Sequence, residues 1–227
     1  MNNYRLTVAG LGPGDAGLMT RETWTRIEQA EQIVLRTHIH PSAEALDTAH
    51  IDYESYDRLY EKTADFETLY AAIVTDLCTR VRTGNLLYLV PGSPHVAERT
   101  VQLLRTAAEE EAISLEILPG MSFLDPLFAA VGIDPVNGLS ILDALNEEQV
   151  SAPLRQDCIF TQVYSRAIAS DLKLLLMEHL SDMQEVYYLH HLSLPDQEVR
   201  RIPLFELDRQ DNMDHLTTIF VPYSPFF

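Results

Sequence analysis

The stretch YRLTVAGLGPGD, residues 4–15, joins an apolar segment to a loop of glycines and a proline. The apolar segment predicts a buried first strand over Tyr4–Gly10. Glycine lets a backbone turn sharply and approach a ligand closely, and open parallel sheets bind ligands beyond the carboxyl ends of their strands. The loop Gly10–Asp15 is therefore a candidate ligand-binding turn.

Two later segments have the same order of strand, Gly/Pro turn and helix. A strand predicted over Leu86–Val90 runs into Pro91–Pro94, and a strand over Leu115–Leu118 runs into Pro119–Ser122. The N–H and C=O groups of such fixed, open turns can hydrogen-bond an adenosyl or amino-acid group. Three turns at strand ends predict a binding site more strongly than any one of them.

The first loop differs from the dinucleotide-binding fingerprint. Its glycine spacing is G-x-G-x-G instead of G-x-G-x-x-G, and Pro13 lacks the N–H that a phosphate cradle uses. Arg36 and Thr37 stand where an acidic residue would follow the second strand. We therefore expect neither NAD nor FAD.

Strand and helix patterns alternate along the chain, which predicts an α/β protein with largely parallel pairing. The clearest helix is Phe66–Val81, with apolar residues at helical spacing after the capping residue Asp65. The other expected helices are Thr20–Glu31, Pro41–Ala49, Val96–Glu109, a helix from Ser122 or Asp125 to Gly132, and Ser165–Leu180.

The second half reads as a mixed sheet. Besides Ile33–Arg36 in the first half, the remaining expected strands are Leu139–Leu142, Cys158–Val163, Glu185–Leu189, Glu198–Ile202 and Thr217–Val221. No long helix separates the last two, so they are expected to pair antiparallel. We predict an N-terminal parallel lobe over residues 1–118 and a C-terminal mixed-sheet lobe over residues 119–227.

Composition narrows the class of protein. With 227 residues, of which 46% are hydrophobic, the chain can bury a core, and no apolar run is long enough to cross a membrane. The net charge of −18 disfavours nucleic acid as a partner. Cys78 and Cys158 are expected to be buried free thiols, and a cytoplasmic location is expected. Tyr53, Tyr56 and Tyr60 are expected to form a partly buried loop or interface surface, or an aromatic substrate wall.

Two pairs of histidines are candidate metal ligands. His38 and His40 alternate like a pair of ligands on a strand, and His190 and His191 are adjacent. Neither pair has a cysteine or carboxylate at metal-ligand spacing, so no metal site is predicted.

In this order and spacing, the segments GLGPGD (10–15), YLVPGSPHVA (88–97) and LPGMSFLD (118–125) resemble the three signatures of the tetrapyrrole (corrin/porphyrin) methylases. The segment PDQEV (195–199) resembles the P-x-Q-x-V motif of that family. The resemblance covers essentially the whole chain. It is greatest to the N-terminal methylase-like domains of MazG-type fusion proteins, whose nucleotide pyrophosphohydrolase activity is not carried over to these residues.

The resemblance implies a homodimer of two α/β/α lobes, with S-adenosylmethionine (SAM) bound in the cleft between the lobes and S-adenosylhomocysteine (SAH) as product. Carried over by position, the residues that would contact the cofactor are Leu11, Pro13, Pro91, Gly92, Ser93, Val96, Ser122, Phe123, Gln162 and Val163. Many members of the family have Gly-Asp-Pro where this chain has Gly92-Ser93-Pro94, so one acidic anchor is missing.

Methyl transfer from a sulfonium needs alignment and a dry site more than a dedicated acid or base. If a proton must leave the acceptor, Asp15 is the first candidate for the general base, and hydrogen bonding to its own loop is the alternative role. The leading hypothesis is a SAM-dependent methyltransferase acting on a tetrapyrrole, a protein side chain or RNA. The alternative is a non-catalytic SAM-binding or dimerisation module that partners a MazG-type nucleotide pyrophosphohydrolase.

Overall fold

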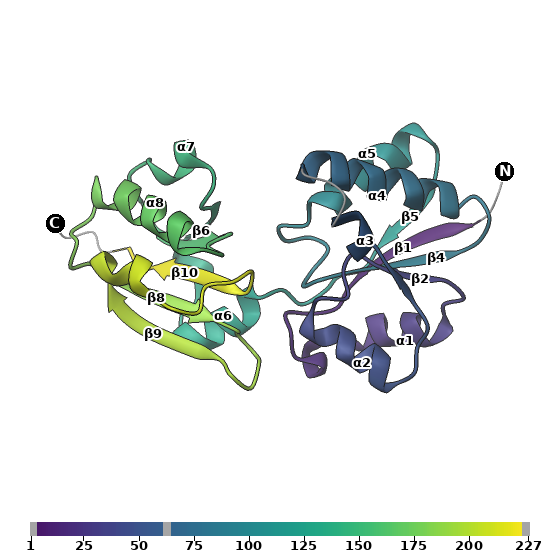
Figure 1. The fold of residues 1–227 in the computed structure, drawn as a ribbon, viewed down its shortest axis with the longest axis horizontal. Coiled ribbons are helices and arrows are strands. Elements are labelled where there is room, and N and C mark those ends of the chain that lie inside the picture. The colour runs from purple at the N-terminus through teal and green to yellow at the C-terminus, as the bar shows by residue number, and fades with distance from the viewer. Residues whose placement is uncertain (1–3, 61–64, 224–227) are drawn as a thin grey trace. The chain divides into compact units, whose positions relative to one another are not determined.

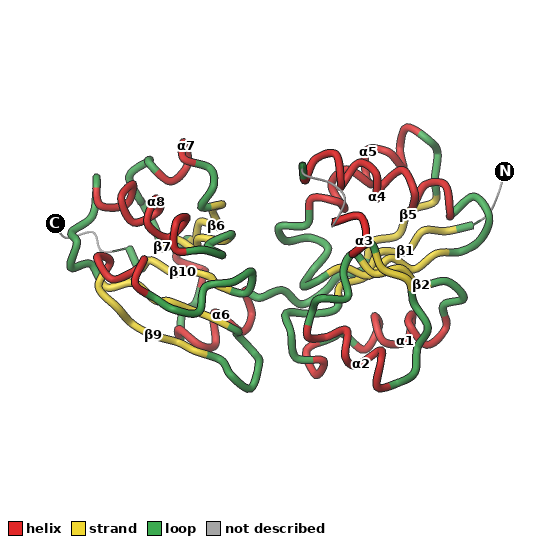
Figure 2. Tube along the Cα trace, in the orientation of Figure 1, coloured by secondary structure: helices red, strands yellow, loops and turns green. Residues whose placement is uncertain are grey.

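The computed structural model describes residues 4–60 and 65–223 and contains two compact units that divide between Leu124 and Asp125. Each unit has a β-sheet with helices packed on it (Figures 1 and 2). This confirms the predicted α/β architecture. The boundary lies after Leu124 instead of after Leu118, because the turn at Gly120 packs against Pro94 of the first unit.

The first unit contains a parallel sheet with the strand order β3-β2-β4-β1-β5. Its strands are β1 (Arg5–Gly10), β2 (Ile33–Leu35), β3 (Glu54–Ser55), β4 (Leu86–Val90) and β5 (Ser114–Ile117). The central strands are almost wholly buried, as strands covered on both faces must be. The carboxyl ends of β4, β1 and β5 therefore lie side by side at one edge of the sheet.

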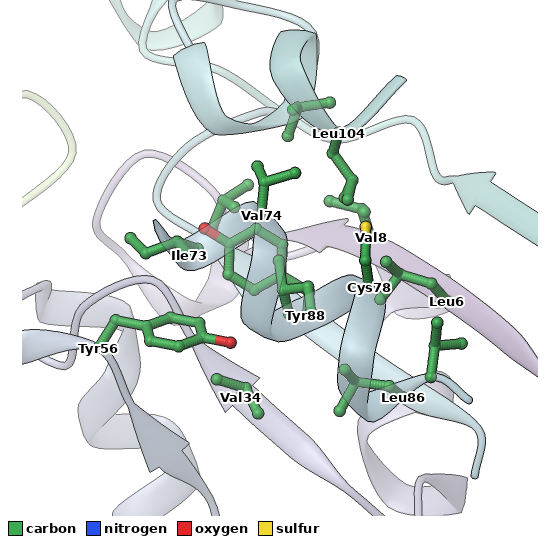
Figure 3. Packing of buried hydrophobic residues seen from close by; sticks show 14 of the residues in the cluster. Leu6, Val8, Val34, Tyr56, Ile73, Val74, Cys78, Leu86, Tyr88 and Leu104 are labelled. Carbon is green, nitrogen blue, oxygen red and sulfur yellow. The ribbon is translucent and has the colours of Figure 1, made fainter. Parts of the chain in front are cut away.

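Helices cover both faces of this sheet. They are α1 (Arg21–Gln29), α2 (Glu44–Thr48), α3 (Asp57–Tyr60), α4 (Phe66–Arg80) and α5 (Arg99–Glu110), with short 3-10 turns η1 (Ala16–Leu18) and η2 (Pro41–Ala43). Figure 1 shows α4 and α5 on one face and α1 and α2 on the other. Successive side chains of β4 point to opposite faces of the sheet, so this strand contributes to the core on both faces. Tyr88 packs under α4 and α5 (Figure 3), whereas Leu87 and Leu89 pack with Ile27 and Leu46 on the other face.

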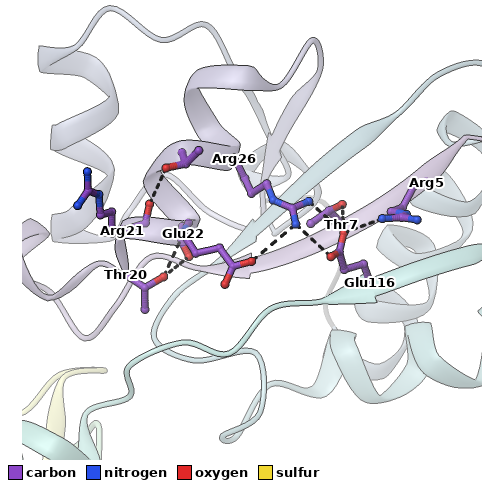
Figure 4. Close-up of polar contacts among 9 residues, drawn as sticks. Arg5, Thr7, Thr20, Arg21, Glu22, Arg26 and Glu116 are labelled. Carbon is purple, nitrogen blue, oxygen red and sulfur yellow. Dashed lines mark hydrogen bonds and ion pairs between the residues drawn. The ribbon is translucent and has the colours of Figure 1, made fainter.

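One polar cluster ties helix α1 to the edge strand β5. The Arg26 guanidinium donates to both carboxylate oxygens of Glu116, at 3.0 and 3.1 Å (Figure 4). Arg5 and Thr7 of the neighbouring strand donate to the same carboxylate. The hydrogen bond and charge of Arg26 lower the pKa of Glu116, so the carboxylate is ionised when the cluster forms.

The second unit contains a mixed sheet with the order β6-β7-β10-β8-β9. Its strands are β6 (Leu139–Asp143), β7 (Asp157–Thr161), β8 (Glu185–His190), β9 (Glu198–Pro203) and β10 (Thr217–Val221). Only β6 and β7 pair in parallel among these described strands. The other elements are α6 (Leu124–Val131), η3 (Pro135–Asn137), α7 (Glu147–Val150), α8 (Arg166–Met177) and η4 (Leu204–Arg209).

The prediction that the last two strands pair with each other is wrong. Strands β9 and β10 both pair antiparallel with β8, one on each side of it. All five residues of β10 are buried, which suits a central strand, whereas β9 alternates and carries Arg200 and Arg201, which suits an edge. The pattern of burial and charge along each strand therefore predicts the order of strands in the sheet better than the length of the segment between β9 and β10.

Local chemistry sets the helix ends. The Oγ1 atom of Thr20 accepts from the N–H of Thr23, and the Asp65 carboxylate accepts from Glu67 and Thr68, as their predicted capping roles require. The helix predicted from Val96 begins at Arg99 instead, because Glu98 is its capping residue. Strand β3 and helix α3 were not predicted, because both are too short to show periodicity.

No helix in the described part of the chain is long and apolar enough to cross a membrane.

Helix α8 offers a direct test of the hydrophobic core of the second unit, which we call the second core. Leu172 is fully buried there, while Leu174, two residues on, is 58% exposed. Leu172→Ala should lower the free energy of unfolding by about 2–5 kcal/mol, because it leaves a cavity. Leu174→Ala should change it by less than about 0.5 kcal/mol in urea unfolding. Equal losses would contradict the placement of this helix.

Candidate functional site

The first and second Gly/Pro loops are joined by backbone hydrogen bonds beyond the ends of β1 and β4. The Leu11 N–H donates to the Val90 carbonyl at 2.8 Å. The N–H of Gly12 donates to the Gly92 carbonyl at 3.1 Å, and the N–H of Gly92 donates to the Gly12 carbonyl at 2.9 Å. The two loops are therefore held together by their main chains.

The glycines let the three loops pack more closely than side chains would allow. A Cβ atom on Gly10 would lie 2.1 Å from the Gly92 carbonyl oxygen and 2.8 Å from Pro94 Cδ. A Cβ atom on Gly120, in the third loop, would lie 3.1 Å from Pro94 Cδ and 3.6 Å from Gly10 Cα. The three segments singled out in the sequence thus meet at the carboxyl edge of the first sheet.

Gly92 differs from these two glycines because one side of it is open. Its φ of +64° is in the left-handed region, and a Cβ atom there would meet no described atom within 4 Å. Pro91 and Val96, on either side, are half-buried. The second loop therefore presents bare main chain to open space, which is the surface that a ligand needs for close approach.

The other predicted cofactor residues of the first unit have varied surroundings. Leu11 and Pro13 are buried, and the Leu11 side chain belongs to the core, so only its main chain can contact a ligand. The hydroxyls of Ser93 and Ser122 accept hydrogen bonds from the N–H groups two residues on and stabilise their own turns. Phe123 is half-buried.

Asp15 is exposed at the end of the first loop. Its carboxylate accepts a hydrogen bond from the Gly17 N–H at 2.7 Å and caps the turn η1. The predicted hydrogen-bonding role is therefore confirmed, and the general-base role stays a prediction.

The two remaining predicted residues follow strand β7 of the second unit. Gln162 is exposed with a φ of +65°, an uncommon conformation for a residue other than glycine. Val163 is fully buried in the second core. A contact between the cofactor and these residues stays a prediction.

An ion pair adjoins the second loop. The Arg36 Nε atom, just beyond β2, lies 3.3 Å from Glu98 Oε2, and both side chains are largely buried. Glu98 also accepts from the N–H and hydroxyl of Thr100, which fixes the start of α5. Burial lowers the pKa of Arg36, but Glu98 and the neighbouring tyrosines together outweigh it and raise the pKa, so Arg36 is cationic. The pattern before α5 did not single out Glu98.

Several polar atoms around Arg36 are buried without a hydrogen-bond partner in the described chain. They are Arg36 Nε, His40 Nδ1 and the Tyr60 hydroxyl. Burial and the charge of Arg36 lower the pKa of His40 to about 4, and burial raises the pKa of Tyr60 to about 12. At neutral pH the histidine is neutral and the tyrosine keeps its proton. Buried polar atoms are nearly always paired, so these atoms mark a place where water or a ligand would be bound.

The sequence model of the family Tetrapyrrole (Corrin/Porphyrin) Methylases matches residues 5–208 of this chain. The chain belongs to this family. Among its relatives, YabN of Bacillus subtilis is 37% identical over 218 residues, which make up 96% of this chain and 45% of YabN. The chain thus spans less than half the length of YabN.

Other relatives of this chain are more distant. The precursor mroMa1 of Mycena rosella, a methyltransferase and borosin cyclic peptide precursor, is 29% identical over 57% of this chain and 33% of its own length. Cobalt precorrin-4 methyltransferase CbiF shares the fold with a TM-score of 0.75 at 15% identity, covering 96% of this chain and 94% of CbiF. For uroporphyrin-III-C-methyltransferase from Thermus thermophilus the TM-score is 0.72 at 19% identity, covering 96% and 92%.

The close packing of the loops can be tested with two alanine substitutions. Gly10→Ala puts a methyl group against a backbone oxygen and should lower the free energy of unfolding by about 1–3 kcal/mol. Gly120→Ala puts its methyl group 3.1 Å from the ring edge of Pro94 and at ordinary contact distance from its other neighbours, so it should cost less than about 1 kcal/mol. Urea unfolding measures both. A smaller loss for Gly10→Ala than for Gly120→Ala would contradict the packing described.

Proposed function

We propose that this methylase-family protein is a SAM-dependent methyltransferase whose first unit binds the cofactor against the second loop. The observation that carries the proposal is the bare main chain at Gly92, open on one side and held by the glycine contacts behind it. Family membership supports the same reading.

The residues present fit such a cofactor. Main-chain groups of Pro91 and Gly92 would hold its polar atoms, and Val96 and Phe123 would pack on its apolar parts. Gln162 is proposed as the contact from the second unit. SAM supplies a methyl group bound to a positively charged sulfur. When the methyl group is transferred, the sulfur keeps the bonding electrons and becomes the neutral thioether of SAH.

The protein contributes alignment and a suitable electrostatic field. A net charge of −18 attracts a cationic cofactor over long range, and the rigid loops keep the bound molecule in one orientation. Asp15 is proposed to hold the first loop, and to take up a proton if the acceptor releases one. No other acid or base is required for an in-line displacement.

The acceptor is proposed to bind near Arg36, where several buried polar atoms of the described chain have no hydrogen-bond partner. The cation and the Tyr60 hydroxyl can donate hydrogen bonds to a carboxylate or a carbonyl oxygen. Both a tetrapyrrole and a peptide carry such groups. RNA is disfavoured because the same negative charge repels its phosphates.

Cofactor binding can be measured by calorimetry with SAM and with SAH. Gly92→Val would fill the open space with a side chain and should weaken the affinity for both by roughly tenfold or more, equivalent to about 1.4 kcal/mol. Gly132→Val is the matched control, since Gly132 also has a left-handed φ, +76°, and open space around it, but ends helix α6 in the second unit.

Both substitutions strain the backbone by about 1–3 kcal/mol, so thermal melting should show similar losses of stability for the two variants. Only Gly92→Val should lose affinity. Failure of the unsubstituted protein to bind SAM or SAH at millimolar concentration would refute the proposal, and unchanged affinity in Gly92→Val would refute the placement of the site.

A second candidate function is a SAM-binding or dimerisation module that does not transfer methyl groups and acts with a MazG-type nucleotide pyrophosphohydrolase. Ser93 favours it, because this position is acidic in many family members, while here the buried hydroxyl accepts a hydrogen bond from the His95 N–H of its own turn.

Turnover distinguishes the two functions. Incubation with SAM and a panel of tetrapyrroles and peptides should yield SAH and a methylated acceptor if the protein is an enzyme. The substitution Arg36→Gln should then reduce turnover far more than it reduces the affinity for SAM, because Arg36 is proposed to bind the methyl acceptor. Tight SAM binding without turnover on any acceptor, and a change in SAM affinity when a pyrophosphohydrolase is added, would favour the module.

A further inference from the structure

Two adjacent histidines at the end of β8 have their rings on the same side of the backbone. Residues His190 and His191 would point to opposite faces if the strand continued. The strand ends at His190, and His191 takes a φ of +52°. The two imidazole rings therefore stack, with centroids 3.7 Å apart and an interplanar angle of 19°.

A carboxylate from a distant part of the chain faces both rings. Asp214 Oδ1 lies 3.3 Å from His190 Nε2, and Asp214 Oδ2 lies 2.8 Å from His191 Nε2. One ligand atom from each of the three residues lies within 4.8 Å of the others. The carboxylate is itself fixed, because Leu216 N–H donates to it and the Asp214 N–H donates to the Thr217 hydroxyl.

The ring of His190 is not satisfied by this arrangement. Its side chain is 7% exposed, and its Nε2 atom is buried without a hydrogen bond, since the carboxylate oxygen 3.3 Å away is poorly aligned. A buried nitrogen without a partner is costly. A cation between His190 and Asp214 would give this atom its missing partner.

His191 carries the outer contact that metal-bound histidines usually have. Its Nδ1 atom is 2.7 Å from Asp196 Oδ2, so the Nδ1–H donates to this carboxylate. Its Nε2 atom, which hydrogen-bonds Asp214 without an ion, would bind the ion once it has lost its proton. Asp196 lies two residues before β9, which pairs with β8, and Asp214 lies three residues before β10. The pairing of β10 with β8 brings Asp214 to three residues that lie close together in the sequence.

We propose that His190 Nε2, His191 Nε2 and an Asp214 oxygen bind a divalent transition-metal ion, with Asp196 orienting His191. Two imidazoles and one carboxylate suit Zn²⁺, Co²⁺ or Ni²⁺ better than Mg²⁺ or Ca²⁺, which prefer oxygen ligands. Metal–ligand bonds of about 2.0–2.1 Å require the stacked rings to splay apart, which side-chain rotation achieves. Three protein ligands leave a fourth position for water or an external ligand.

The site lies at the edge of the second sheet where both β7 and β8 end. Gln162 follows β7 at this same edge, so an ion and its water would lie at the edge of the second sheet where Gln162 also lies. The metal proposal does not depend on the proposed function, because all its ligands belong to one unit.

Zn²⁺ binding to chelator-treated protein tests the site, by calorimetry and by the visible absorption of Co²⁺. The protein should bind one ion, and Zn²⁺ should raise its melting temperature. His190→Gln and Asp214→Asn should abolish both effects, and Asp196→Asn should weaken binding by roughly 10–100-fold. The matched control is His38→Gln, which breaks a histidine–aspartate contact of 2.7 Å that has no second imidazole.

Circular dichroism of the metal-free variants shows whether each one folds. Asp196 is exposed, so Asp196→Asn alters the site without changing the buried His190 ring. No Zn²⁺ binding at about 100 μM, or equal binding by His190→Gln and the unsubstituted protein, would overturn the proposal. Loss of binding in His38→Gln would do the same. These readouts do not involve SAM, so they can fail while the proposed function stands.

Discussion

The contact between Gly10 and the Gly92 carbonyl is the constraint on which the candidate site depends. A Cβ atom at Gly10 would lie 2.1 Å from that oxygen, so the first and second loops can meet only where neither has a side chain. The paired hydrogen bonds between Gly12 and Gly92 then hold the second loop with its other side open. The third loop completes the packing through Gly120.

Much of this could be predicted from the sequence because it is local. Glycines and prolines restrict the backbone wherever they occur, so the three turns were visible, as were the capping residues Thr20 and Asp65. The full burial of the central strands was visible in their unbroken apolar runs. The family resemblance added the order of the three loops and the ligand expected there.

The rest depends on contacts between distant segments. The pairing of β9 and β10 was predicted wrongly because connection length says little when a third strand can lie between two others. Glu98 was missed because its partner Arg36 is far away in the sequence. The carboxylate of Asp214 was missed because it lies next to His190 and His191 only through the order of the strands. Such sites need the sheet topology before they can be recognised.

We propose that the three loops form one ligand-binding surface. Hydrogen–deuterium exchange of the protein with and without SAH tests this claim at the level of single segments, since a bound ligand protects the amides it covers. We expect slower exchange in residues 10–17, 90–97 and 118–123 together, and unchanged exchange in helix α8. Protection confined to other segments, or none at saturating SAH, would contradict it.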